Sequence, residues 1–248
     1  MRFKLYIEYD GTQYSGWQKQ QNSKTIQGTL INAIENSFSK ARGNSKFTDL
    51  QGSGRTDSGV HAIEQIAHLE CDTMIAPHIL NIKLNDELPA DINILKIEKC
   101  ENNFHARHSA LSRQYLYRIS RRRTAFEKKY VWWIKDDLKV SKMSEVSNLF
   151  LGMNDFKSFS DFDDENKSTK VLVESLEIYE EEDLILIRIK ASHFLWKMVR
   201  RLVGTLVEIG RENIGQKEIK NFLISYSDIP SKFTAPPSGL FLEKVYYK

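Results

Sequence analysis

The segment QGSGRTDSG, residues 51–59, is the stretch from which the fold can be worked out. Three of its nine residues are glycine, and glycine clusters interrupt strands and helices. Its only carboxylate is Asp57, next to Thr56 and close to Arg55. This composition predicts a loop that presents Asp57 on a tight turn, where a carboxylate can act as nucleophile, base or electrostatic stabiliser. An ordinary Asx-type turn is the alternative, because Asp and Gly are common turn formers.

Apolar spacing predicts regular elements on both sides of this loop. Phe3, Leu5 and Ile7 alternate with more polar neighbours, which is typical of a strand. Helical spacing follows Thr25, a suitable N-cap. The predicted elements are a strand at 2–9, a helix at 26–38, a strand ending near Leu50, a strand at 63–70, a helix from Pro77 and a strand at 92–97. Their β-α-β-β-α-β order is the ferredoxin-like signature.

The second half of the chain repeats this order. It shows a strand at 114–120, a helix near 143–150, strands at 171–179 and 184–189, an apolar helix at 194–209, further helix near 216–226 and a last strand at 240–247. The sequence therefore predicts an α+β fold of two ferredoxin-like halves, residues 1–105 and 106–248.

Composition narrows the class of protein. Hydrophobic residues make up 41% of the 248 residues and the mean hydropathy is -0.46, which suits a soluble protein with a real core. The net charge of +3 is too small to identify a nucleic-acid binder by itself. Cys71 and Cys100 lack the spacing of a zinc site. Because no run approaches the ~18 apolar residues of a membrane span and no signal-peptide pattern is present, we expect a cytoplasmic protein without a membrane partner.

Short blocks along the chain accompany the Asp57 loop. They are YDGT at 9–12, GWQ at 16–18, TIQG at 25–28, GRTDSGVHA at 54–62, FHAR at 104–107, YLY at 115–117, MVR at 198–200, VG at 203–204 and APPSGLFL at 235–242. In this order they closely resemble the tRNA pseudouridine synthase A family, which usually has alanine where this chain has Ser58. The resemblance runs from the first predicted strand to the last.

The resemblance implies a fold, a reaction and partners. The fold is the pseudouridine synthase fold, in which two ferredoxin-like halves form a joined mixed or antiparallel sheet with a central basic cleft. The reaction is the isomerisation of uridine to pseudouridine at positions 38 to 40 in the anticodon arm of tRNA. The family forms homodimers in which RNA spans both subunits. Nothing is oxidised or added, so no cofactor and no metal are expected.

Two residues of the loop receive roles from the resemblance. Asp57 matches the catalytic aspartate, which attacks C1′ of the ribose or C6 of the base, or removes a proton from a glycal-like intermediate; the sequence leaves these routes open. Arg55 matches the arginine that helps to extrude the target nucleotide, a step that costs a few kcal/mol of stacking and pairing. The alternative for Arg55 is a surface arginine that braces the loop.

Four residues of the second half receive roles in the same way. Tyr115 matches the active-site tyrosine that stacks on uracil, although an inward-facing core tyrosine fits the spacing equally well and Tyr117 is a lesser candidate. Arg200 matches the buried basic residue that pairs with the aspartate and favours its ionised form. Leu240 and Leu242 wall the base pocket or simply pack in the core.

A basic stretch suits the phosphates of RNA. Its members are Arg118, Arg121, Arg122, Arg123, Lys128 and Lys129, with Trp132 and Trp133 close behind. A solvated charge run is the alternative. His61, His105 and His108 lie near the matching blocks without metal-ligand spacing, so we interpret them as hydrogen-bonding residues.

Three other functions remain open. A paralogous pseudouridine synthase for another RNA such as rRNA fits the departures at Ser58 and in the acidic 161–165 loop. A non-catalytic RNA-binding protein or RNA chaperone on the same fold has no need to keep all four of Asp57, Arg55, Tyr115 and Arg200. A carboxylate-dependent glycosidase usually needs two acids flanking the bond, and only Asp57 lies in a convincing loop.

Overall fold

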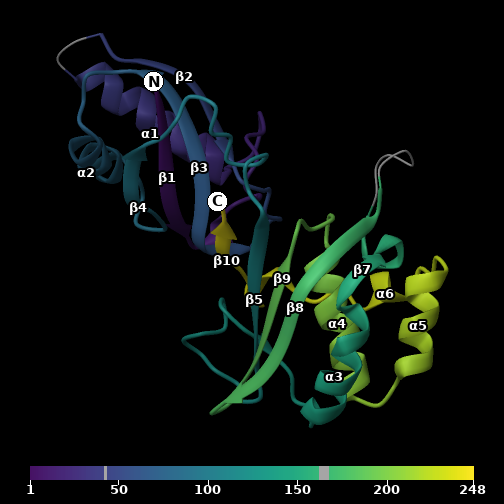
Figure 1. Ribbon diagram of the computed structural model, residues 1–248. Helices are drawn as coiled ribbons and strands as arrows, with labels where there is room; N and C mark the ends of the chain where they lie inside the picture. The colour runs from purple at the N-terminus through teal and green to yellow at the C-terminus, as the bar shows by residue number, and fades with distance from the viewer. Residues whose placement is uncertain (42–43, 162–167) are drawn as a thin grey trace. The chain divides into compact units, whose positions relative to one another are not determined.

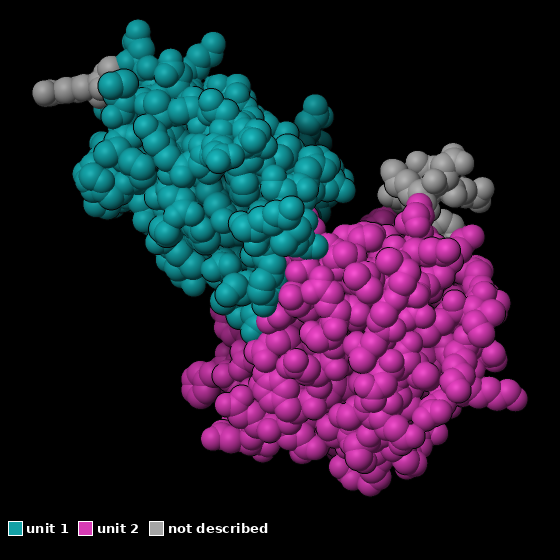
Figure 2. Space-filling model, in the orientation of Figure 1, with its two compact units in different colours: residues 1–111, 242–248 teal, residues 112–241 magenta. Residues whose placement is uncertain are grey.

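The computed structural model describes residues 1–41, 44–161 and 168–248. Within them the chain forms six α helices and ten strands, which confirms the predicted α+β class (Figure 1). Two compact units are present, residues 1–111 with 242–248 (unit 1) and residues 112–241 (unit 2) (Figure 2). The sequence analysis divided the chain near residue 105 and assigned the C-terminal residues to the second half. In the structure, residues 242–248 pack with unit 1.

Unit 1 has the ferredoxin-like order. Its elements are β1 (Arg2–Tyr9), α1 (Ile26–Lys40), β2 (Lys46–Gly52), β3 (His61–Asp72), α2 (Pro77–Glu87) and β4 (Ile92–Lys99), with a short 3-10 helix η1 (Gly11–Gln13) after β1. The strands lie in the order β4-β1-β3-β2, and each neighbouring pair is antiparallel. α1 begins at the predicted cap, because the Thr25 hydroxyl accepts the Gly28 N–H at 3.2 Å.

The core of unit 1 follows from the alternation in β1. Phe3, Leu5 and Ile7 are fully buried, and the helix residues Leu30 and Ile34 are buried as well. α1 and α2 pack against each other, so one face of the sheet is covered by apolar helix surface. The loop that carries Asp57 leaves this frame at the end of β2 and returns to it at the start of β3.

Unit 2 is built on an antiparallel row of strands in the order β5-β9-β8-β7. Its elements are β5 (Ser112–Ser120), β6 (Trp132–Trp133), α3 (Val140–Ser147), η2 (Asn148–Phe150), β7 (Gly152–Asp155), η3 (Lys157–Phe159), β8 (Lys170–Glu181), β9 (Leu184–Ala191), α4 (Met198–Gly210), α5 (Gln216–Ile224), α6 (Ile229–Lys232) and η4 (Pro237–Gly239). β6 pairs with β5 in parallel, so the strands are of mixed direction. β10 (Leu240–Tyr246) begins at the end of unit 2 and finishes in unit 1.

α4 is shorter than the sequence predicted. Apolar spacing placed its start at Phe194, but the helix begins at Met198. Lys197 has a φ of 61°, in the left-handed region, so the chain cannot enter the helix earlier. Among the described residues no helix has both the length and the apolar character that crossing a membrane requires.

Candidate active site

The loop around Asp57 is anchored through its neighbour Thr56. The Thr56 hydroxyl and the Tyr9 hydroxyl are hydrogen-bonded at 2.8 Å in a buried position. The Thr56 carbonyl accepts the Trp17 N–H at 3.1 Å. Thr56 itself is buried, while Asp57 is half-buried and Arg55 is exposed. Thr56 is therefore fixed, and it holds its neighbours Arg55 and Asp57 in the loop.

A tight turn follows Asp57. The Val60 N–H donates to the Asp57 carbonyl at 3.2 Å, and Gly59 has a φ of 76°. The Ser58 hydroxyl donates to the Tyr14 carbonyl at 3.1 Å, and the Gly59 N–H donates to the same oxygen at 3.3 Å. The left-handed turn requires glycine at position 59, and the bonds to Tyr14 tie it to the segment after β1.

Two glycines from the N-terminal blocks allow this segment to lie against the loop. A Cβ at Gly16, where φ is 89°, would lie 2.6 Å from the Thr56 carbonyl oxygen. A Cβ at Gly11 would lie 2.0 Å from the Val60 carbonyl oxygen. Gly54 differs, because apart from its two chain neighbours no described atom lies within 4 Å of the place where its Cβ would be. Packing therefore explains Gly11 and Gly16, but leaves Gly54 facing open space.

Arg55 is oriented by two glutamines that the sequence marked only as parts of blocks. Its Nε donates to Gln18 Oε1 at 3.0 Å, and Gln18 Nε2 donates to Gln27 Oε1 at 2.8 Å. Gln27 is buried, and its Nε2 donates to the Leu50 carbonyl at 2.7 Å. A chain of hydrogen bonds thus connects the end of β2 to the guanidinium. Residue type alone gave no sign of this role, because glutamine is common at surfaces.

Tyr115 and Tyr117 differ in their surroundings, although both are buried on β5. The Tyr115 ring meets the edge of Phe194, with centroids 4.9 Å apart and an interplanar angle of 85°. The Tyr117 hydroxyl donates to the Pro236 carbonyl at 2.8 Å, and its ring packs against Trp132. Burial raises the pKa of Tyr117 well above its usual value, which Arg200 only partly offsets. The ring and the hydroxyl of Tyr117 are therefore both engaged by other residues of unit 2.

Arg200 lies half-buried on α4 and is held by the C-terminal block. Its Nε donates to the Ala235 carbonyl at 2.7 Å, and the Ala235 N–H donates back to the Arg200 carbonyl at 3.1 Å. A Cβ at Gly204 would lie 1.5 Å from the Phe233 carbonyl oxygen, so glycine is required for this close approach. The blocks at 198–204 and 235–242 therefore form one packed structure.

Leu240 and Leu242 are 5% and 1% exposed, so both side chains pack inside the protein. The sequence left core packing and a base-pocket wall open for them, and their burial agrees with packing. Asp57 and Arg55 belong to unit 1, as does Leu242, whereas Tyr115, Arg200 and Leu240 belong to unit 2.

The basic stretch is partly neutralised by carboxylates. Three of its arginines form ion pairs, which are Arg118–Glu127 at 3.5 Å, Arg121–Glu180 at 2.7 Å and Arg122–Asp183 at 2.9 Å. Arg123 instead lies over Trp133, with its guanidinium carbon 5.9 Å from the ring centroid. The positive charge available to a ligand is therefore smaller than the sequence of this stretch suggested.

Asp161 makes contacts that the sequence did not reveal. Its carboxylate pairs with Lys197 at 2.6 Å and with Arg201, which is only 6% exposed. Burial opposes ionisation of Asp161, but Lys197 and Arg201 outweigh it and hold the pKa of the carboxyl below its usual value. Residues 162–165 of the predicted acidic loop lie outside the described residues.

The histidines near the blocks take part in hydrogen bonds. His61 Nδ1 accepts the Gly11 N–H at 3.1 Å, and His105 Nδ1 accepts the Arg107 N–H at 3.2 Å. The His105 ring also lies between the tilted rings of His68 and His108, with centroid distances of 4.7 and 4.3 Å. No group of three His, Cys, Asp or Glu suited to a metal ion occurs in the described part of the chain.

Comparison with known proteins places the chain in a family. A family model described as tRNA pseudouridine synthase matches residues 5–109 and 146–248. Proteins named tRNA pseudouridine synthase A from Thermoanaerobacter pseudethanolicus and Ehrlichia chaffeensis are each 38% identical, over 245 and 251 residues. These alignments cover 98% of both chains and 100% of both chains, respectively. The chain therefore belongs to the tRNA pseudouridine synthase family, and it is an isomerase.

Proposed function

We propose that this protein converts uridine to pseudouridine at positions 38 to 40 of the tRNA anticodon stem-loop, with Asp57 as the catalytic nucleophile. The observation that carries the proposal is the fixed turn around Asp57. Thr56 is anchored on one side of the carboxylate by Tyr9 and Trp17, and Ser58 and Gly59 are anchored on the other by Tyr14. A half-buried carboxylate on such a turn is held in place for a reaction with a bound uridine.

The reaction needs no electron donor or acceptor. The N1–C1′ bond of uridine breaks, the uracil turns, and C5 bonds to C1′; the hydrogen leaves C5 and N1 gains one, so that the product is an isomer. As nucleophile, Asp57 forms a temporary covalent bond at C1′ or at C6, which splits the exchange into two easier steps. In the glycal route the same carboxylate acts as a base.

Residues of both halves contribute to this proposal. Arg55, oriented by Gln18, assists extrusion of the uridine from the stem-loop, where a guanidinium can occupy the vacated space. Tyr115 stacks on the uracil, and Arg200 favours the ionised carboxylate. Leu240 and Leu242 supply the apolar wall of the base pocket. In this proposal the first half carries the catalytic loop, and the second half contributes Tyr115 and Arg200.

Recognition of the tRNA extends beyond the reacting base. The phosphate contacts that we propose are Arg118, Arg121, Arg122 and Arg123. In the complex, the first three either break their ion pairs or bind a phosphate and the carboxylate together. We further propose a homodimer that acts in the cytoplasm.

Chemical mapping of pseudouridine tests the proposal. Wild-type protein, Asp57→Asn and Asp57→Ala are each incubated with unmodified tRNA and with rRNA, and binding is measured in parallel. We expect product in the anticodon arm with the wild type and none with either variant, while all three proteins bind tRNA. Equal product from the variants would remove Asp57 from the mechanism, and product only in rRNA would reassign the substrate.

A further inference from the structure

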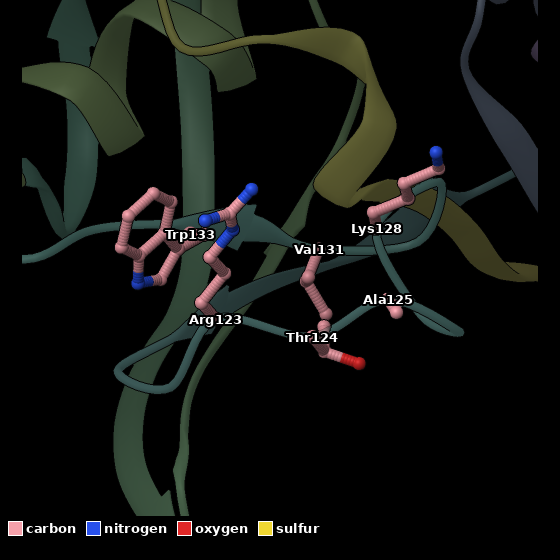
Figure 3. A pocket seen from close by; sticks show the side chains of 6 residues that line it. All are labelled: Arg123, Thr124, Ala125, Lys128, Val131 and Trp133. Atoms are coloured by element: carbon pink, nitrogen blue, oxygen red, sulfur yellow. The ribbon is translucent and has the colours of Figure 1, made fainter.

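A cavity of about 510 Å³ lies in unit 2, in the segment between β5 and α3. It is lined by Arg123, Thr124, Ala125, Lys128, Val131 and Trp133, and we call it the 123–133 pocket. Figure 3 shows Arg123 and Trp133 at one end of this group and Lys128 at the other. Of its lining residues, only Arg123 has a role in the function proposed above, as a phosphate contact.

The charge of the pocket is available to a ligand. Glu127, Glu180 and Asp183 are paired with neighbouring arginines of the stretch. In the described residues no carboxylate forms an ion pair with Arg123 or Lys128. Two cations left unneutralised at a cavity favour an anionic ligand.

Aromatic rings accompany these cations. Trp133 is 44% exposed, and the Arg123 guanidinium lies over its ring. Phe126, on the same segment, is 94% exposed. Exposed rings beside lysine and arginine are typical of surfaces that bind single-stranded nucleic acid, where bases stack and phosphates meet cations. An acidic peptide would use the charges but not the rings, so RNA fits the pocket better.

The two ends of the segment that lines the pocket are fixed before a ligand arrives. The Ile134 N–H donates to the Ser120 carbonyl at 3.0 Å, and the Ser120 hydroxyl donates to the Arg122 carbonyl at 2.6 Å. The Ser238 hydroxyl donates to the Val131 carbonyl at 3.1 Å. Both ends of the segment are thereby tied to the body of unit 2, which lowers the ordering cost of binding.

We propose that the 123–133 pocket binds one nucleotide of the RNA substrate other than the uridine that reacts. Arg123 and Lys128 contact the backbone phosphates on its two sides, and Trp133 stacks on its base. Ile119 of β5 lies opposite Trp132, four residues from Tyr115, which is ~13 Å at ~3.3 Å per residue. An RNA strand bound at Tyr115 can extend over that distance. The inference rests on the proposed tRNA substrate.

Salt dependence of tRNA binding tests the phosphate contacts. Dissociation constants of the full-length protein for labelled tRNA are measured at several KCl concentrations for the wild type, Arg123→Ala and Lys128→Ala. Lys220→Ala, which removes an exposed charge from α5, is the matched control. We expect each pocket variant to weaken binding and to reduce the slope of log Kd against log[KCl] by about 1, because one phosphate contact is lost. Slopes equal to that of Lys220→Ala would overturn the proposal.

The base contact is tested with Trp133→Leu. We expect binding to weaken ~5-fold or more with the salt slope unchanged, since stacking is lost without loss of charge. Unchanged affinity would overturn the stacking role. Unchanged thermal unfolding midpoints show that the variants are folded, as expected for exposed or half-exposed side chains.

Two further measurements separate this inference from the proposed function. A wild type that binds tRNA without making product would refute the proposed function, while the salt slopes still decide on the pocket. Uridine 5′-monophosphate and inorganic phosphate serve as competitors. Displacement of tRNA by either small molecule from the wild type but not from Arg123→Ala is expected if RNA occupies the pocket. Tight binding of either small molecule that leaves the affinity for tRNA unchanged would overturn the RNA assignment in favour of a free nucleotide or phosphate.

Discussion

The Tyr9 hydroxyl lies 2.8 Å from the Thr56 hydroxyl, inside the protein, and this bond joins the end of β1 to the loop that carries Asp57. Burial raises the pKa of Tyr9 above its usual value, so the phenol stays protonated. The neighbour of the candidate catalytic carboxylate is thus fixed by a neutral hydrogen bond that does not change with physiological pH.

Removing this bond should affect both stability and rate. In Tyr9→Phe the buried Thr56 hydroxyl loses a partner, so we expect the free energy of unfolding to fall by about 1–3 kcal/mol. We also expect slower pseudouridine formation at saturating tRNA, because the loop is less constrained. Denaturant unfolding and single-turnover kinetics measure the two effects. The double variant Tyr9→Phe/Thr56→Val should lose less free energy of unfolding than the two single variants together. A loss equal to their sum would contradict a direct bond.

Gly16 and Gly54 form a matched pair of substitutions. Gly16→Ala places a Cβ 2.6 Å from the Thr56 carbonyl oxygen at a φ of 89°, and we expect a loss of at least about 1–2 kcal/mol from the left-handed backbone alone. Gly54→Ala meets no described atom, so its unfolding midpoint should match the wild type. If Gly54→Ala is as unstable as Gly16→Ala, the packing explanation fails; if it is stable but inactive, substrate occupies the space beside Gly54.

The Gln18–Gln27 pair should act through Arg55. Gln27→Met keeps the side-chain length but removes the acceptor that holds Gln18. We expect the rate at saturating tRNA to fall on the order of 10- to 100-fold, as for misplaced catalytic groups, with tRNA affinity little changed. Gln51→Met, at an exposed glutamine of β2, is the control. A loss of affinity without a loss of rate would exclude a positioning role for Gln27.

His68 should make stability depend on pH. Burial, with His105 and Arg2 nearby, lowers the pKa of His68 to about 4. The unfolded chain takes up this proton near pH 6.5, so stability is complete above that value and is lost as the pH falls from 6.5 towards 4. His68→Gln should flatten the fall of the unfolding midpoint between pH 6.5 and 5, whereas His78→Gln, at an exposed position, should not. If both variants show the same dependence of the unfolding midpoint on pH, His68 does not cause the loss of stability at low pH.

Local patterns predicted much of the fold. The alternation around Phe3, the cap at Thr25 and the glycines of the 51–59 loop each depend on neighbours in the sequence, and these elements form as expected. The predicted start of α4 was wrong because Lys197 adopts a left-handed conformation, which the spacing of apolar residues does not indicate.

Contacts between residues far apart in the sequence could not be predicted from local patterns. Arg121 and Arg122 meet Glu180 and Asp183, which lie far along the chain at the β8–β9 turn, so their pairing cannot be read from the basic stretch. The role of Gln27 likewise depends on the Leu50 carbonyl, at the end of a strand that follows α1. The family blocks include Gln27 but not the basic stretch, and they do not show which atoms meet.

Unit 1 finishes with residues 242–248, which are synthesised only after all of unit 2. The Leu111 N–H donates to the Tyr246 carbonyl at 2.8 Å, and the Tyr247 hydroxyl donates to the Ala106 carbonyl at 2.6 Å. At typical translation speeds, the N-terminal unit waits on the order of ten seconds for these partners. A ribosome that stalls within residues 112–241 therefore holds an unfinished unit 1, and chaperones can bind it during that delay.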